Sequence, residues 1–190
     1  MSVRISHIVV GIYQENTYFL KADDNSTVVV DPGGSGKEIE KYINDNGLKV
    51  SMVINTHGHP DHTEANKYMK EKYGMPVYIH PEDAQLFGIT YDQPLTDGQE
   101  IDFNGNKLKI MLTPGHTFGS VCIKGDGFLI TGDTIFEGTI GRTDLGGDSR
   151  VMMHTLKTKF NDIPDETVLY PGHGDSTTMG NERKFNPYLS

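Results

Sequence analysis

The sequence has little cysteine: Cys122 is the only one among 190 residues. A single cysteine excludes an internal disulfide and a metal site built from several thiolates. Cys122 lies in Ser120-Val121-Cys122-Ile123, an apolar run that is typical of a strand. We therefore interpret it as a small buried hydrophobic residue rather than as a catalytic thiol.

Long hydrophobic runs are also missing from the sequence. No stretch approaches the ~20 apolar residues that a membrane span needs. The first residues, Met1-Ser2-Val3-Arg4-Ile5, lack the apolar core of a signal peptide. These two absences predict a cytoplasmic location and no membrane partner.

Positive charge is scarce in this chain. The 17 Lys and Arg residues stand against 26 Asp and Glu residues, which gives a formal net charge of -9. Nucleic acids and anionic membranes both select basic surfaces, so neither is expected as the main partner. A small molecule is the kind of partner that this charge balance leaves open.

The sequence does contain an alternation of apolar runs and helical patterns, punctuated by 22 glycines. Its length predicts one domain over residues 1–190. Strands are expected at Arg4 to Val10, Thr17 to Lys21, Thr27 to Val30, Val50 to Asn55, Val77 to Ile79, Glu100 to Phe103, Lys107 to Leu112, Val121 to Lys124, Phe128 to Thr131 and Thr167 to Tyr170. Helices are expected from Ser35 to Gly47, from Ala65 to Gly74, after Pro81, and over Met152 to Phe160. Many strands with few helices suit an α/β fold of two mixed sheets with helices outside.

One short run carries the strongest functional signal: His57-Gly58-His59-Pro60-Asp61-His62. In an extended segment, side chains two residues apart project to the same side, so His57 and His59 can reach one ion. This pattern should arise by chance in roughly one chain per thousand of this composition. Taken singly, His57 can simply end a strand and Asp61 can cap a helix. Taken together, the residues predict a metal site.

Further candidate ligands lie just after the ends of other predicted strands: His116, Asp133 and His173. Loops at one edge of a sheet system can converge on a single point. Imidazole and carboxylate ligands suit zinc, iron(II), manganese or cobalt. Three histidines on one ion leave an open position, the catalytic rather than the structural arrangement. Asp133 is the best candidate for a carboxylate shared by two ions, and a turn or helix cap is its alternative role.

The whole set of motifs resembles the metallo-β-lactamase superfamily, and within it the compact glyoxalase II-like (hydroxyacylglutathione hydrolase-like) branch. The resemblance covers nearly the full chain. The segments that carry it are Asn16-Thr17-Tyr18, Asp31-Pro32-Gly33-Gly34, Thr56 to His62, Thr113-Pro114-Gly115-His116-Thr117, Thr131-Gly132-Asp133-Thr134 and Pro171-Gly172-His173-Gly174. The resemblance implies a four-layer αββα sandwich with the site at the edge of its two sheets.

The same resemblance implies two divalent metal ions, with zinc expected first and iron or manganese as alternatives. It assigns His57, His59 and His116 to the first ion, and Asp61, His62 and His173 to the second. Asp133 would bridge the two ions. We expect the carboxylates of Asp61 and Asp133 to serve catalysis as well as metal binding.

A hydrolase that cleaves a thioester is the function that we predict from these residues. A metal lowers the pKa of bound water from 15.7 to about 7, which gives a hydroxide that can attack an acyl carbonyl. A thiolate leaving group needs little help from a general acid, so a thioester suits the site, and the resemblance implies S-lactoylglutathione or a related acyl-thiol as the substrate. A persulfide dioxygenase is the alternative, with one iron on His57, His116 and Asp133.

Other functions stay open at this stage. A lactonase could use the same ligands. A β-lactamase is less favoured, given the lack of a signal peptide and the loop around Arg142. A metal-binding module without activity is weakened by the open coordination of a three-histidine set.

The end of the chain and one loop bear on the substrate. Ser190 follows His173 closely, so the C-terminal helical region that helps glyoxalase II enzymes to hold glutathione is not expected. The segment Gly138 to Leu145 is similar instead to a segment of compact bacterial glyoxalase II-like proteins and of persulfide dioxygenases. Within it, Arg142, Thr143 and Asp144 are the predicted substrate-binding residues, with Arg142 on a substrate carboxylate. A structural pair between Arg142 and Asp144 is the alternative.

Three more residues have two possible roles each. Asp31 can orient a ligand histidine through its second ring nitrogen, or it can cap the turn at Gly33 and Gly34. His80 can lie near the site or merely pack beside it. Tyr18 can line the pocket or belong to the core.

Overall fold

The computed structural model describes residues 3–189, and two six-stranded sheets form its centre. The strands of the first sheet are β1 (Arg4–Val10), β2 (Glu15–Lys21), β3 (Ser26–Val30), β4 (Lys49–Ile54), β5 (Val77–Ile79) and β6 (Gln93–Pro94), which lie side by side in this order. The pairs β1–β2 and β2–β3 are antiparallel, and the pairs from β3 to β6 are parallel. The first sheet is therefore mixed.

The second sheet is mixed as well. Its strands, in spatial order, are β14 (Thr177–Thr178), β13 (Val168–Pro171), β10 (Phe128–Gly132), β9 (Val121–Lys124), β8 (Asn106–Leu112) and β7 (Glu100–Phe103). Only β10 and β13 run parallel among the described neighbours of this sheet. A small hairpin of β11 (Ile135–Phe136) and β12 (Thr139–Ile140) stands beside it.

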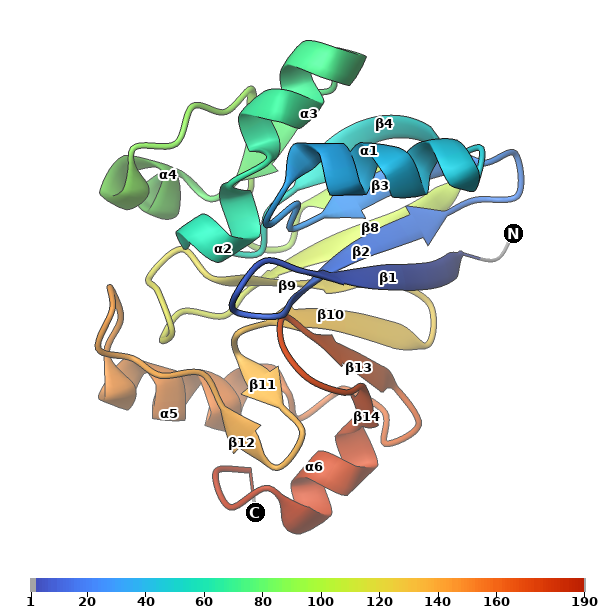
Figure 1. The fold of residues 1–190 in the computed structure, drawn as a ribbon. Helices are drawn as coiled ribbons and strands as arrows, with labels where there is room; N and C mark the ends of the chain where they lie inside the picture. The colour runs from blue at the N-terminus through green and yellow to red at the C-terminus, as the bar shows by residue number, and fades with distance from the viewer. Residues whose placement is uncertain (1–2, 190) are drawn as a thin grey trace.

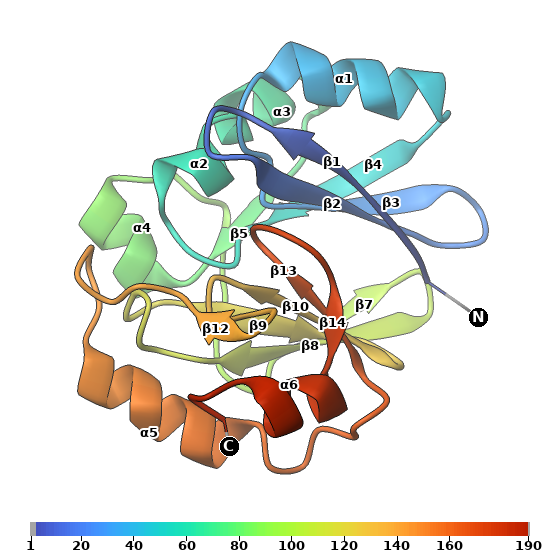
Figure 2. The same ribbon diagram turned by 60° about the horizontal axis from the view of Figure 1, so that its bottom comes forward.

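Helices cover the outer faces of both sheets (Figure 1). They are α1 (Gly36–Asp45), α2 (Pro60–Thr63), α3 (Asn66–Tyr73), α4 (Pro81–Phe87), α5 (Ser149–Lys159) and α6 (Met179–Phe185). Figure 2 shows α1 and α3 on one side of the paired sheets and α5 and α6 on the other. The predicted four-layer αββα sandwich is confirmed. Within residues 3–189, no helix has the length and apolar character required to cross a bilayer.

The alternation of side chains along each strand explains the layers. In β3, Val28 and Val30 point into the core between the sheets, where they join Ile110 of the second sheet. Val29, between them, joins Ile39 of α1 in the outer core. A strand turns successive side chains to opposite faces, so a run of valines can serve two cores at once. Each such fully buried aliphatic side chain contributes about 1.5–3 kcal/mol through burial.

The structure also holds elements that the sequence patterns did not predict. The short strands β6, β11, β12 and β14 have two residues each, too few to show a period of two. Helix α6 has seven residues and contains Gly180, so its helical pattern is weak. Its first turn is capped by the Thr178 hydroxyl, which accepts from the Asn181 amide at 3.3 Å.

Candidate metal centre

The sequence-predicted site residues come together at one edge of the sandwich. His57 and His59 follow β4, and Asp61 and His62 lie in α2. His116 lies in the loop after β8, over residues 113–120. Asp133 follows β10, and His173 lies in the loop after β13, over residues 172–176. Strand ends from both sheets therefore deliver side chains to the same place, although these segments lie far apart in the chain.

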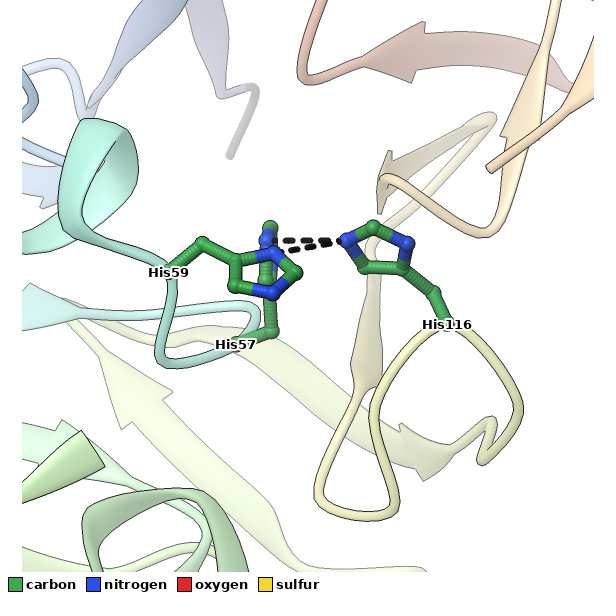
Figure 3. A group of neighbouring side chains, drawn as sticks. All are labelled: His57, His59 and His116. Atoms are coloured by element: carbon green, nitrogen blue, oxygen red, sulfur yellow. Dashed lines mark hydrogen bonds between the residues drawn. The ribbon is translucent and has the colours of Figure 1, made fainter. Parts of the chain in front are cut away.

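Three histidines form the first group of possible ligands (Figure 3). Nε2 of His116 lies 2.9 Å from Nδ1 of His59 and 3.3 Å from Nε2 of His57. All three side chains are buried. Burial, together with the neighbouring imidazoles, lowers the pKa of His57 well below its usual range, and burial lowers the pKa of His116. These two rings are therefore neutral at pH 7, the form that binds a metal.

The outward nitrogens of these rings fix their tautomers. Nδ1 of His116 lies 2.6 Å from the Arg142 carbonyl oxygen, and Nε2 of His59 lies 2.8 Å from that of Leu145. A carbonyl only accepts, so both of these nitrogens must donate. Their other nitrogens then turn lone pairs toward each other at 2.9 Å. Facing lone pairs repel, and a bound cation removes that repulsion.

His57 completes this arrangement. The Thr56 hydroxyl lies 2.6 Å from Oδ2 of Asp31 and donates to it, so it accepts from Nδ1 of His57 at 3.0 Å. Nε2 of His57 is then unprotonated, and its lone pair is the third that points into this group, toward Nε2 of His116. The donor set therefore fits a divalent metal ion with three nitrogen ligands.

The second group of possible ligands is formed by Asp61, His62 and His173. Nε2 of His173 lies 3.3 Å both from Nε2 of His62 and from Oδ2 of Asp61. Nδ1 of His173 donates to the Tyr13 carbonyl at 3.0 Å, which turns its Nε2 inward. Burial lowers the pKa of His173, but the hydrogen bond with Asp61 outweighs it and raises that pKa, so Nε2 carries a proton that a metal ion would displace.

Negative charge gathers around the second group. Burial lowers the pKa of His62, but the carboxylates, first those of Asp133 and Asp31, outweigh it and raise that pKa to about 10. Burial likewise raises the pKa of Asp61, but the hydrogen bond with His173 and the charge of His62 lower it to about 2. The group thus attracts a cation, and a metal ion would displace the His62 proton.

Asp133 stands between the two groups. Its Oδ1 lies 3.4 Å from Nε2 of His62, and its Oδ2 lies 3.5 Å from Nε2 of His116 and 3.7 Å from Nε2 of His173. Oδ1 is buried and has no hydrogen-bond partner among the described residues. An orphaned buried carboxylate oxygen is costly unless a cation satisfies it. This placement suits a carboxylate that bridges two metal ions.

Asp31 holds the second group from outside. Its Oδ2 accepts from Nδ1 of His62 at 3.0 Å, and its Oδ1 accepts from the Thr56 amide at 2.7 Å. The Asp31 side chain therefore orients the His62 ring, rather than capping the turn at Gly33 and Gly34. Asp31, His57 and His62 also form a possible ligand group by distance. However, both Asp31 oxygens already accept protein hydrogen bonds, which makes Asp31 a supporting residue.

Several functional residues were missed by the sequence analysis. The Asp83 carboxylate is fully buried and accepts from the amides of Gly58 and Gly119 and from the Thr117 hydroxyl. It thereby ties the loop of His57 and His59 to the loop of His116. An acidic residue inside a short helix carries no sequence signal for such a role.

Two more missed residues come from β2. Burial raises the pKa of Glu15, whose Oε1 lies 3.9 Å from Nδ1 of His62. Asn16 donates to the carbonyls of Pro171 and Gly174 and so holds the loop of His173. The family-like segment that begins at Asn16 was the available signal for this role.

The predicted substrate-binding residues lie on the rim. Nε and Nη2 of Arg142 donate to the two carboxylate oxygens of Asp144 at 2.6 and 2.7 Å. The structural pair, the alternative role of Arg142, is thus formed here, and hydrogen bonding to Arg142 lowers the pKa of Asp144 to about 2. Thr143 is half-buried beside them. A substrate contact by these three residues stays a prediction.

His80 and Tyr18 serve the fold. Nδ1 of His80 accepts from the Glu82 amide at 3.4 Å and caps α4. Tyr18 belongs to the core between the sheets, and its hydroxyl donates to the Pro171 carbonyl at 2.6 Å. His7 and His154 lie outside the two ligand groups, on β1 and α5.

A cleft of about 570 Å³ opens over the two groups. Its lining residues are Tyr13, His59, Pro60, Asp61, His116, Asp133, Phe136, Arg142, Leu145 and His173. The cleft therefore combines the possible metal ligands with an apolar and aromatic rim, a composition typical of a small-molecule site. Fold and cleft together define an αββα protein with a histidine and aspartate cluster at the edge of its two sheets.

The chain belongs to the metallo-β-lactamase superfamily, whose family model matches residues 10–173. Among its relatives, the probable metallo-hydrolase YqgX of Bacillus subtilis is 35% identical, with 95% of each chain covered. The hydroxyacylglutathione hydrolase GloC of Haemophilus influenzae is 30% identical, with 99% of each chain covered. Membership in a metallo-hydrolase superfamily agrees with the resemblance in the motifs.

Solved structures agree with this assignment. The BLEG-1 B3 metallo-β-lactamase has a TM-score of 0.91 at 31% identity, and the match covers 98% of this chain and 100% of that one. The structure of TTHA1623 in a di-iron-bound form has a TM-score of 0.84 at 30% identity, with 97% and 100% covered. Divalent metal ions therefore suit the histidine and aspartate cluster of this chain.

Proposed function

We propose that this protein is a dinuclear metal-dependent thioesterase that hydrolyses S-lactoylglutathione or a related acyl-thiol. The observation that carries the proposal is the position of Asp133, with one oxygen toward His62 and the other toward His116. A shared carboxylate is what holds two ions at the ~3.5–4 Å separation of two-metal sites. The name of the relative GloC, hydroxyacylglutathione hydrolase, supports the substrate class.

The residues of the chain would divide the work as follows. His57, His59 and His116 would hold one ion, and Asp61, His62 and His173 the other, with Asp133 shared. Bound divalent ions would supply a hydroxide from water near neutral pH and polarise the acyl carbonyl. The backbone carbonyls on the outward ring nitrogens keep the inward nitrogens of His59 and His116 free for ligation.

The class of leaving group can be inferred from the lack of a positioned general acid among the described residues of the cleft. Outside the two ligand groups, the described lining residues with a proton to give are Tyr13 and Arg142. The Tyr13 side chain is 68% exposed, and its hydroxyl makes no hydrogen bond among the described residues that would hold it over the ligand groups. The Arg142 guanidinium is bound to Asp144, and it is too basic to act as a general acid at neutral pH. A thiolate departs without protonation, so a thioester suits this cleft better than an unactivated amide. Water adds across the C–S bond and yields a carboxylic acid and a thiol.

The decisive experiment is a hydrolysis assay on protein whose metal content is measured in the same sample. Chelator-treated protein is reloaded with zinc, iron(II) or manganese and tested on S-lactoylglutathione and on simpler thioesters. We expect cleavage that rises up to two ions per chain. His59→Ala and Asp133→Asn should each lower kcat/KM by at least about 100-fold. His154→Ala, which changes an exposed histidine on α5, is the matched control and should keep full activity.

Three outcomes would reject the proposal. Oxygen uptake on a persulfide by protein with one iron per chain would establish the dioxygenase on His57, His116 and Asp133. Faster opening of lactones than of any thioester would establish a lactonase. Unchanged metal binding with no turnover in any of these assays would indicate a metal-binding module.

A further inference from the structure

A second hollow leads away from the cleft over His59. It measures about 350 Å³ and is lined by His59, Leu86, Phe87, Leu145 and Gly146. It shares His59 and Leu145 with the cleft over the ligand groups. We name this hollow and its continuation along α4 the side groove.

The side groove continues along α4. The next hollow measures about 590 Å³ and shares Leu86 with the first. Its lining residues are Glu82, Asp83, Gln85, Leu86 and Phe118. In the first hollow, Leu86 and Phe87 of α4 face Leu145 and Gly146, which precede α5. The two hollows thus meet at Leu86, and together they extend from the ligand groups toward Phe118.

Large apolar side chains are exposed along this path. Leu86 is 55%, Leu145 50% and Phe118 45% exposed, and they come from three separate segments of the chain. A single exposed apolar residue is ordinary, but several along one groove indicate a binding surface.

The groove is also held in place. The ring of Phe87 lies 5.0 Å from the ring of His59 in an edge-on contact. A Cβ at Gly146 would lie 3.0 Å from Leu86, so glycine at this position keeps the space beside Leu86 open.

The charges around the side groove exclude an anionic occupant. Its described lining residues include no lysine or arginine. The Asp83 carboxylate is buried and accepts three hydrogen bonds from the protein. Glu82 is exposed in the hollow that contains Phe118, and its negative charge repels anions. The carboxylates of a glutathionyl group or the phosphates of a nucleotide would find no counter-charge here. An uncharged hydrocarbon chain fits this lining.

We propose that the side groove binds the hydrocarbon acyl chain of the substrate. The inference rests on the proposed thioesterase function. Among the related acyl-thiols of that proposal, it favours linear acyl groups with several methylenes over the short lactoyl group. The carbonyl would lie over the ligand groups, the acyl chain would run past His59 toward Leu86 and Phe118, and the thiol would occupy the cleft near Tyr13 and Phe136.

The test is a series of acyl thioesters on one uncharged thiol, N-acetylcysteamine, with acetyl, butyryl, hexanoyl and octanoyl groups. Full burial of a methylene improves affinity about fourfold, so a half-open groove should give about twofold per methylene. We expect kcat/KM to rise by that factor, chiefly through KM. Leu86→Ser and Phe118→Ser should each flatten the rise. The control Phe185→Ser changes a residue that is 67% exposed on α6 and should leave the rise intact.

A binding experiment separates this inference from the proposed function. Calorimetry on the zinc-loaded protein measures the affinity of acetate, butyrate, hexanoate and octanoate, the acid products of the series. Tighter binding of the longer acids, reduced in Leu86→Ser, would support the groove even where no thioester is cleaved. Thioester cleavage with equal rates across chain lengths, or a rise that Leu86→Ser leaves unchanged, would overturn the groove while the thioesterase stands.

Discussion

The Asp83 carboxylate accepts a hydrogen bond from the Gly58 amide at 2.8 Å. Gly58 separates two candidate metal ligands, His57 and His59, whereas Asp83 belongs to α4. The same carboxylate reaches Gly119 in the loop of His116. One buried acid therefore joins the two loops that supply the three-histidine group, and its removal should affect metal binding as well as stability.

Asp83→Ala should destabilise the fold by about 2–4 kcal/mol, because two amides and the Thr117 hydroxyl lose their acceptor in a buried place. It should also weaken zinc binding at the three-histidine group by about 10–100-fold. Urea unfolding and competition with a coloured chelator measure the two effects. Asp92→Ala is the control, since Asp92 accepts from Val77 and Lys70 away from the site. Native zinc affinity in Asp83→Ala would contradict a positioning role.

Asp31→Ala should act on the other group of ligands. Without its carboxylate, Nδ1 of His62 loses its partner, and we expect the second ion to bind about 10–100-fold more weakly. The first ion should be affected much less. Stepwise zinc titration, read by calorimetry, would show one tight site and one weakened site. Equal weakening of both sites would argue that Asp31 supports the whole loop region rather than His62.

Gly172→Ala should disturb the bridge between the two groups. A Cβ at position 172 would lie 2.3 Å from Oδ1 of Asp133 and 2.6 Å from Cε1 of His62. The carboxylate must then shift, and we expect metal stoichiometry to fall from two toward one with at least tenfold lower activity. Elemental analysis of the purified variant measures this. Gly180→Ala, on α6, is the control. Two full sites in Gly172→Ala would show that the bridge tolerates displacement.

Because of Cys122, the free energy of unfolding should fall in alkaline solution. Burial raises the pKa of its thiol to about 11, from about 8.5 in an unfolded chain. Above pH 8.5 the unfolded state loses this proton first, so the stabilisation present at lower pH declines as pH rises toward 11. The decline due to this thiol should reach about 3 kcal/mol.

Unfolding of the wild type and of Cys122→Ala between pH 7 and pH 11 measures this contribution. The buried Tyr18 adds its own alkaline loss in both proteins, because burial raises its pKa as well, so the difference between them isolates the thiol. Native protein should also react slowly with Ellman's reagent. Parallel pH curves for the two proteins would contradict the prediction.

Much of the fold could be predicted because its signals are local. The run of valines in β3 was expected at Thr27 to Val30 and extends over Ser26–Val30. The strands predicted at Val121 to Lys124 and Phe128 to Thr131 form the antiparallel pair of β9 and β10. The helix predicted from Ser35 begins at Gly36, and the Glu38 amide bonds to the Ser35 carbonyl rather than to its hydroxyl. Competition between neighbouring acceptors is decided by geometry that residue types do not specify.

The candidate site divides in the same way. The run from His57 to His62, together with His116, Asp133 and His173, stands out in the sequence because rare residue types gather at short spacing or at strand ends. Asp83 and Glu15 have no such signal in the sequence, because residue type alone does not show whether an acidic side chain is buried or exposed. The side groove was equally invisible, since Leu86, Phe118 and Leu145 lie far apart along the chain.

The amino-acid sequence by itself determined most of the strands and helices, through their periods, and which side chains could bind metal. Its motifs predicted the four layers through their resemblance to a known family. Only the tertiary structure decided which nitrogen of each histidine points inward and which acid supports which ring. It also decided that Arg142 pairs with Asp144. The physical reason is that these choices depend on contacts between segments distant in the chain, which local pattern does not encode.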